Sequence, residues 1–505
     1  MLRDRTRRST VTLLLSLTAL AASGHAAAGG AGERSLAALQ QQFAQMQARL
    51  QQLVEENRSL REEQQHLERR LAQLALVATP APGAAPTAVA FASAAALASQ
   101  PPPASPSAAS PSAASPSAGP QAARAEGPRL WGYGEVYYAN PTREGRRTRA
   151  DLARAVFGLG YSFDERTEFN SEFEVEHAVA SAGDVGEFDV EQFYVDRRLG
   201  DSVSARGGLL LMPFGLINEH HEPTRYFGVQ RNFVETLIIP STWREGGVSL
   251  RGDTRLGLGW NVGLTTGFDL SKWQFTSAFP PYASALELST SGAAPLQAAH
   301  QELSLANARH LSQYAAASYY GVPALLLGGA ITMGKAVGIA LPPGAGGATS
   351  DPRVTLWEAH ARWTPSKLDL SALYARGSIS DTGTVNAAHA GAVNPVPSSF
   401  YGYFLEGAYE LWEQGGYRAV PFLRLERYKL GASYAGTSGP VLPSGLVPLS
   451  EAAGDLGYWP ANHDRVWTAG TNFYLGAHVV LKGDYQWFES NASFRRFDLG
   501  LGVSF

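Results

Sequence analysis

Two periodicities of apolar residues divide the chain. From Leu36 to Leu74 the apolar positions recur at steps of three and four, which is the spacing of one helix face in a coiled coil. From Leu130 onward the period is two, most clearly over the last eleven residues, where apolar and polar positions alternate. The pattern therefore predicts a long helix followed by a large all-β domain.

The helical stretch, residues 33–77, carries a heptad seam that only Asn57 and Gln64 interrupt. Its apolar positions are Leu36, Leu39, Phe43, Met46, Leu50, Leu53, Leu60, Leu67, Leu71 and Leu74. Polar residues at such positions fix register and strand number, so we expect a coiled coil that joins copies of the chain. The alternative is an amphipathic helix lying on a membrane, but its polar face is rich in Gln and Glu rather than in Lys and Arg.

The segments on either side of this helix have distinctive compositions. Residues 1–28 place four arginines ahead of an apolar run and then small residues, which is the order of a secretory signal peptide. Residues 78–127 are almost wholly Ala, Pro, Ser and Gly, a composition typical of a disordered linker. No other apolar run reaches the length of about 20 residues that a transmembrane helix needs.

The region 128–505 contains sixteen candidate strands. They cover residues 131–138, 153–163, 167–177, 188–198, 203–212, 243–252, 257–269, 312–320, 324–334, 354–364, 367–376, 401–411, 419–427, 464–475, 477–487 and 495–505. A tight turn follows every even candidate, whereas long loops follow most odd ones. Short turns on one rim, long loops on the other, an even strand count and aromatic residues at strand ends predict a 16-stranded antiparallel transmembrane β-barrel of the outer membrane.

Two segments of this region resemble a known family. The stretch from Met212 to Gly247, MPFGLINEHHEPTRYFGVQRNFVETLIIPSTWREGG, is similar to the third-loop region of the porins that include the phosphate-selective porins O and P. Phe505, on an alternating last strand, resembles the signal that the β-barrel assembly machinery reads in Gram-negative barrels. The resemblance implies a trimeric outer-membrane porin with a periplasmic N-terminal stalk, which lets small hydrophilic solutes or anions diffuse passively.

In a water-filled barrel, the polar face of every strand is expected to line the lumen. The charged residues expected there are Arg154, Glu168, Glu172, Glu174, Arg206, Arg362, Arg424, Lys482 and Asp484. Mixed signs on a pore wall create a transverse field that orients polar solutes. For each single residue, a salt bridge within the wall is an equally valid interpretation.

Residues 213–242 form the third long loop, which is apolar enough to fold inward and narrow the pore. It contributes the candidate constriction residues Glu219, His220, His221, Glu222, Arg225, Arg231 and Glu235. Imidazole and carboxylate groups are also zinc ligands, but adjacent histidines in a loop rarely converge on one ion. We therefore predict neither a metal nor another cofactor.

Composition narrows the possible functions. The chain of 505 residues has a formal net charge of −4 and no cysteine, which argues against nucleic acid as a partner and excludes thiol chemistry. Of its 41 Lys and Arg, 11 precede residue 128, and so do 8 of its 45 Asp and Glu, which leaves the barrel region at −7. Phosphate filters need dense positive charge. A general porin is therefore favoured over a phosphate- or anion-selective channel.

Two other classes of function remain as alternatives. A barrel enzyme would need a nucleophile with its base, and the sequence has no G-x-S-x-G, H-E-x-x-H or G-x-x-x-x-G-K motif, so we predict no enzymatic activity. A tether would use the stalk to grip peptidoglycan, with the pore incidental. Outer-membrane lipid and further copies of the chain, as a homotrimer, are the remaining expected partners.

Overall fold

The computed structural model describes residues 127–143, 148–178, 186–273, 275, 294–297, 299–342, 349–392, 394–437, 463–490 and 495–505. The predicted signal peptide (1–28), the coiled coil (33–77) and all but the last residue of the predicted linker (78–127) lie outside these residues.

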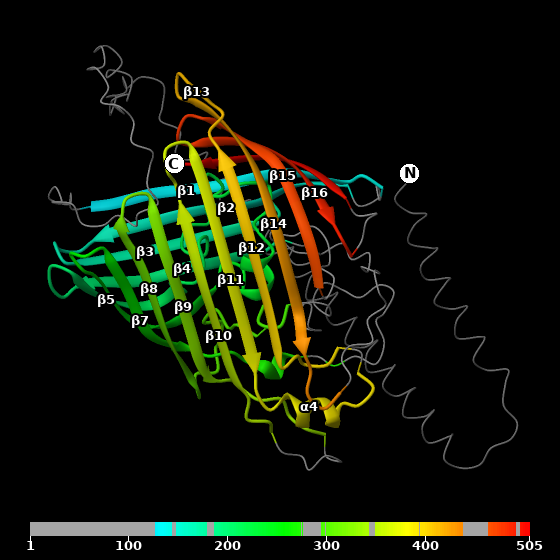
Figure 1. The fold of residues 1–505 in the computed structure, drawn as a ribbon. Helices are drawn as coiled ribbons and strands as arrows, with labels where there is room; N and C mark the ends of the chain where they lie inside the picture. Colours follow the sequence, from blue (N-terminus) through cyan, green and yellow to red (C-terminus); the bar gives the residue numbers. More distant parts are fainter. Residues whose placement is uncertain are drawn as a thin grey trace, which may run out of the picture. The chain divides into compact units, whose positions relative to one another are not determined.

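The described strands form one closed antiparallel sheet (Figure 1), because β1 (Gly127–Pro141) pairs both with β2 (Arg149–Ser162) and with β17 (Arg496–Ser504). The other strands are β3 (Thr167–Glu176), β4 (Phe188–Arg198), β5 (Val203–Leu211), β6 (Arg244–Asp253), β7 (Leu258–Thr266), β8 (Leu311–Val322), β9 (Leu325–Lys335), β10 (Arg353–Trp363), β11 (Leu368–Ile379), β12 (Ser399–Tyr409), β13 (Trp412–Gln414), β14 (Tyr417–Ser433), β15 (His463–Leu475) and β16 (Val479–Phe488). β12 and the short β13 pair in succession with β14, so they share one position in the sheet. The predicted antiparallel barrel of sixteen strands is confirmed.

The two faces of each strand differ in chemistry because successive side chains in a strand point to opposite sides of the sheet. On β17, Leu499 and Leu501 are exposed on the outside, whereas Arg496 and Asp498 are buried on the inside. The outer surface is predominantly apolar, as a strand that faces lipid requires.

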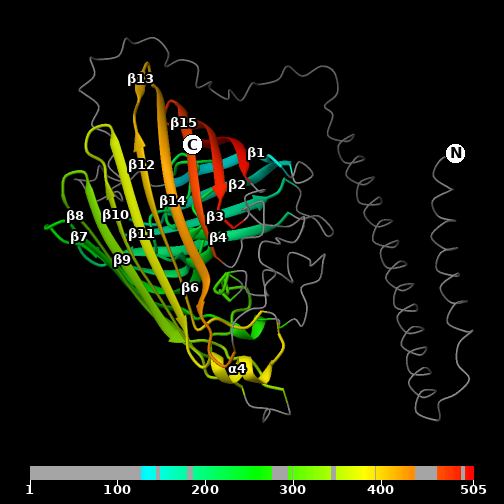
Figure 2. The ribbon, with the colours of Figure 1, turned by 45° about the vertical axis from the view of Figure 1, so that its right-hand side comes forward.

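Turns and loops are sorted to opposite rims, which agrees with the sequence prediction. Tight turns follow β2, β4, β6, β8, β10, β13 and β15, and positive φ angles at Gly257, Ser366 and Gly476 let the chain reverse there. In Figures 1 and 2, β13 lies at the short-turn rim and the helix α4 (Thr382–Ala388) lies at the opposite, long-loop rim. Within the described ranges, none of the helices is both long and apolar enough to cross a membrane.

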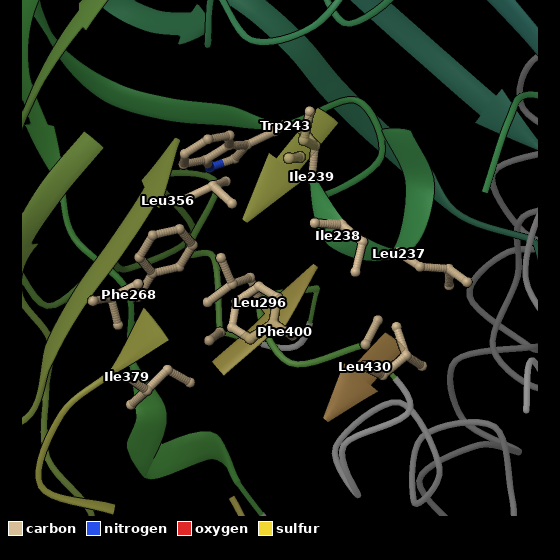
Figure 3. Packing of buried hydrophobic residues seen from close by; sticks show 14 of the residues in the cluster. Leu237, Ile238, Ile239, Trp243, Phe268, Leu296, Leu356, Ile379, Phe400 and Leu430 are labelled. Carbon is tan, nitrogen blue, oxygen red and sulfur yellow. The ribbon is translucent and has the colours of Figure 1, made fainter. Parts of the chain in front are cut away.

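An apolar cluster occupies the inside of the barrel toward the long-loop rim (Figure 3). Leu356 on β10, Ile379 on β11, Phe400 on β12 and Leu430 on β14 point inward there and pack against loop residues such as Leu296. The expectation that the inward face of every strand is polar is therefore wrong for this part of the lumen. Loop side chains exclude water from these positions, so apolar residues are stable there.

Candidate functional site

The loop that joins β5 to β6, residues 212–243, lies against inward-facing side chains of the barrel wall; we call it the third loop. The backbone N–H of Val229 donates to Asp484 on β16 at 2.6 Å, and that of Phe233 donates to Glu426 on β14 at 2.6 Å. Asn472 on β15 accepts from the N–H of Gly228 at 3.2 Å. These bonds attach the middle of the third loop to three neighbouring strands.

A second attachment holds the start of the third loop to β1, β2 and β4. Nε2 of His221 lies 2.6 Å from the hydroxyl of Tyr133 and 3.3 Å from Oε1 of Glu191, while the Tyr133 hydroxyl donates to Oε2 of Glu191 at 2.9 Å. Arg154 on β2 donates to the carbonyl oxygen of His221. All four side chains are buried, so water does not compete for these bonds.

Glycines on the inner face of β17 let the third loop approach the backbone of the wall. A Cβ atom at Gly502 would lie 2.5 Å from Cβ of Pro223, and one at Gly500 would lie 3.1 Å from Cγ1 of Val229. The first distance is shorter than real carbon contacts allow. The loop therefore packs in space that a larger residue at Gly502 would occupy.

Glu235 organises the third loop from within. Its carboxylate accepts hydrogen bonds from the N–H of Ile217 at 3.0 Å and from Nδ2 of Asn232 at 2.6 Å, and it also accepts from the N–H of Leu216. Burial raises the pKa of Glu235, although these hydrogen bonds act in the opposite direction. The carboxylate therefore connects the two halves of the loop by hydrogen bonds, and it is buried rather than exposed to the lumen.

The later part of the third loop forms a single π-helical turn, η2 (Val234–Ile238), which enters the apolar cluster. Ile238, Ile239 and Trp243 are buried there (Figure 3), and Trp243 stacks on Phe268 with ring centroids 5.4 Å apart. This packing fills the inside of the barrel near β10 to β14.

A cavity of about 240 Å³ lies between the third loop and the wall formed by β6 to β10. The loop contributes Glu219, His220 and Arg225, and the wall contributes polar side chains that include Arg251, Asp253, Asn261, Tyr320, His360 and Arg362. Arg362 makes two hydrogen bonds to Asp369, at 3.0 and 2.6 Å. Within the part of the chain that the structure describes, neither Arg225 nor Arg251 has an ion-pair partner, and Glu219 and Asp253 bring two acidic side chains to the same cavity.

Other predicted wall charges lie underneath the third loop and contact it there. Arg424 binds Glu426 at 2.9 Å and Glu406 at 3.1 Å, and it donates to the carbonyl oxygen of Phe227 at 3.0 Å. The ammonium group of Lys482 lies 3.5 Å from the centroid of the Tyr226 ring. These groups attach the loop to the wall.

The remaining predicted residues are dispersed. Glu168 pairs with Arg129, Glu172 accepts from the indole N–H of Trp131 at 2.6 Å, Arg206 pairs with Asp196 at 2.7 Å, and Glu174 is buried 4.0 Å from Arg154. Arg231 donates to Ser241 and Thr242, whereas Glu222 makes no side-chain hydrogen bond among the described residues. Phe505 extends β17 and exchanges two backbone hydrogen bonds with Gly132 on β1.

Three wall partners of the third loop, Tyr133, Glu191 and Glu426, were not predicted from the sequence. Arg251 alternates in phase with Ser249 and Asp253, so strand periodicity could have placed it on the inner face. Glu191 lies at a bulge, where the register between β3 and β4 shifts, so simple alternation does not assign its face. His220 lines the cavity whereas His221 is buried beside Tyr133, and no group of three or more potential metal ligands occurs within the described ranges.

No protein-family model matches the chain. An uncharacterized protein of Aquifex aeolicus (strain VF5) is 38% identical over 156 residues, which are 31% of this chain and 36% of that protein, so the match spans about a third of the relative's length. Three similar solved structures each cover 75% of this chain: OmpF of Salmonella typhi in a complex with daunomycin (12% identity, TM-score 0.46, 97% of that chain), an anion-selective porin from Comamonas acidovorans (13%, 0.44, 99%) and the outer membrane channel DcaP of Acinetobacter baumannii (11%, 0.41, 97%).

Proposed function

We propose that the protein is an outer-membrane channel through which small hydrophilic solutes or ions diffuse passively. The closed barrel with an apolar outer surface supports this proposal, because in lipid only a closed sheet satisfies all the backbone hydrogen bonds of strands. The cavity beside the third loop also supports the channel proposal, because the polar groups that line it along β6 to β10 can solvate a permeating solute. On this proposal the third loop narrows the pore from the side of β14 to β17.

A preference for anions is the second candidate function, and it rests on Arg225 and Arg251. Both line the cavity without an ion-pair partner among the described residues, and Glu219 and Asp253 are the acidic side chains that share the cavity. The two arginines act on a permeating ion more strongly than the barrel's net charge does, because a narrow passage responds mainly to its nearest charges. The single wall lysine Lys482 is covered by Tyr226, which argues against a dense phosphate filter.

Planar-bilayer recording of the purified protein tests both statements. We expect stepwise conductance, a reversal potential of anion sign in a salt gradient, and no block by added phosphate. Absence of conductance would contradict the channel. A cation-sign reversal potential would remove the anion preference, and block by phosphate would restore the phosphate-selective alternative.

The proposal also covers assembly and location. The chain forms a homotrimer in the outer membrane, the coiled coil 33–77 stands in the periplasm, and the assembly machinery reads Phe505. Deleting residues 29–127 distinguishes the channel from the tether alternative. If the protein is a channel, the deleted form keeps its conductance. If it is a tether to peptidoglycan, cells that carry the deletion lose envelope integrity.

A further inference from the structure

Six basic side chains form a band on the outside of the barrel at the long-loop rim. We call them the rim cations: Lys335 on β9, Arg353 on β10, Arg376 on β11, Arg427 and Lys429 on β14, and Arg465 on β15. Register places them beside one another: Lys335 is opposite Arg353, and Arg427 is opposite Arg465. Tyr401 on β12 is opposite both Arg376 and Lys429, so the band continues across that strand.

The rim cations point away from the lumen. Arg353 alternates in phase with the outward Trp357 and Trp363, and Arg427 is in phase with the outward Leu423. Their inward neighbours Val354 and Glu426 are buried. The band therefore faces what surrounds the barrel.

The height of the band matches the far interface of a bilayer. Arg353 lies ten residues along its strand from Trp363, Arg427 ten from Tyr417, and Arg465 ten from Leu475, each counted from the short-turn rim. A tilted transmembrane strand crosses the hydrocarbon core in about 9–11 residues. If the short turns are periplasmic, as in bacterial barrels, the rim cations reach the headgroups of the external leaflet.

Most of this charge has no counterion among the residues that the structure describes. Lys335 pairs with Asp351 and Arg465 with Glu489, each at 2.7 Å and each on exposed side chains. Among the described residues, Arg353, Arg376, Arg427 and Lys429 have no acidic partner within 4.0 Å.

We propose that the rim cations bind the phosphate groups of an anionic glycolipid in the external leaflet. Guanidinium groups bind phosphate through two parallel N–H donors, and Tyr401 provides an aromatic surface at headgroup level between them. The lipid supplies the negative charge that the described residues around the band do not provide, and it covers the wall from β9 to β15. The inference rests on the membrane placement in the proposed function, but not on conduction through the pore.

Native mass spectrometry in detergent tests the proposal, with a diphosphorylated diglucosamine lipid and its dephosphorylated form as probes. The test variant is R353Q/R376Q/R427Q/K429Q. The matched control, R166Q/R197Q/R255Q/K367Q, removes the same number of positive charges, but at the short-turn rim. We expect the unmodified protein and the control to retain the phosphorylated lipid, the test variant to bind it at least tenfold more weakly, and all three to bind the dephosphorylated form weakly.

Three results would overturn the inference: equal binding of both lipid forms, unchanged binding by the test variant, or an equal loss in the control variant. Complete displacement of the lipid by millimolar inorganic phosphate would also overturn it, because the band would then be a site for the free anion. Conductance in neutral phosphatidylcholine bilayers, measured on the same samples, distinguishes a failure of the lipid-binding inference from a failure of the channel proposal. We expect that conductance to be unchanged in the test variant.

Discussion

The hydroxyl of Tyr133 on β1 lies 2.6 Å from Nε2 of His221 in the third loop, and both residues contact the fully buried Glu191 on β4. This contact joins the loop to strands on the side of the barrel where the sheet closes. Its partners lie 88 residues apart in the chain, one on a wall strand and the other in the loop inside the barrel. The position of the loop therefore depends on a small number of buried polar bonds.

Replacing His221 with Ala should release the start of the third loop. The change leaves the Glu191 carboxylate and the Tyr133 hydroxyl with fewer partners in a buried position, which costs about 1–3 kcal/mol. We expect amide hydrogen exchange in residues 214–228 to accelerate roughly tenfold or more, since about 1.4 kcal/mol corresponds to a factor of ten. His220→Ala is the control because His220 is exposed; equal exchange in the two variants would contradict the role given to His221.

Gly502→Val should destabilise the barrel through the third loop. Its Cβ would overlap Pro223, and overpacking of this kind costs about 1–3 kcal/mol. Gly483→Val on the outer face of β16 is the matched control, because the nearest atom to its Cβ is 3.4 Å away on Leu499. Thermal unfolding in detergent should show a lower Tm for the first variant alone, and a similar decrease in both would refute the close approach.

Arg251→Gln should reduce the preference for anions. At a separation of about 8 Å in water, one unit charge changes the energy of a passing ion by about 0.5 kcal/mol, which is roughly a twofold change in the permeability ratio. The reversal potential in a salt gradient measures this ratio. Arg255→Gln, in an exposed turn at the short-turn rim, should leave it unchanged; if the two variants behave alike, Arg251 does not face the permeating ion.

His300 makes the packing of the loop between β7 and β8 dependent on pH. Burial lowers the pKa of His300 to about 3 from a usual value near 6.5, with Arg244 and Lys272 acting in the same direction. The released loop therefore binds a proton below pH 6.5 that the packed loop does not. The stability of the packed loop should fall by up to about 1.4 kcal/mol per pH unit between pH 6.5 and 3.

Hydrogen exchange in residues 299–305 at pH 7 and pH 4, corrected for intrinsic rates, measures this dependence. His300→Gln should remove most of it. His463→Gln, at an exposed position, should preserve it, and a dependence that survives in His300→Gln would assign the effect to another group.

The barrel could be predicted because the sequence signals of its strands and turns are local. Alternation along β17 and tight turns such as the one at Gly476 locate strands within a few residues of where the structure has them, since both depend on the nearest neighbours in the chain. The partners of the third loop were not predictable in this way. His221 meets Tyr133, and Leu296 meets Phe400, only through the closed sheet, and no spacing along the sequence encodes these contacts.

The pairing of β1 with β17 has a consequence for biogenesis. These strands are separated by more than three hundred residues, so every intermediate that lacks either of them presents two open edges with unsatisfied N–H and C=O groups. Hydrocarbon cannot solvate such edges. The pairing of β1 with β17 therefore removes both edges in one closing step, and a chain arrested before this step remains an open sheet rather than a smaller pore.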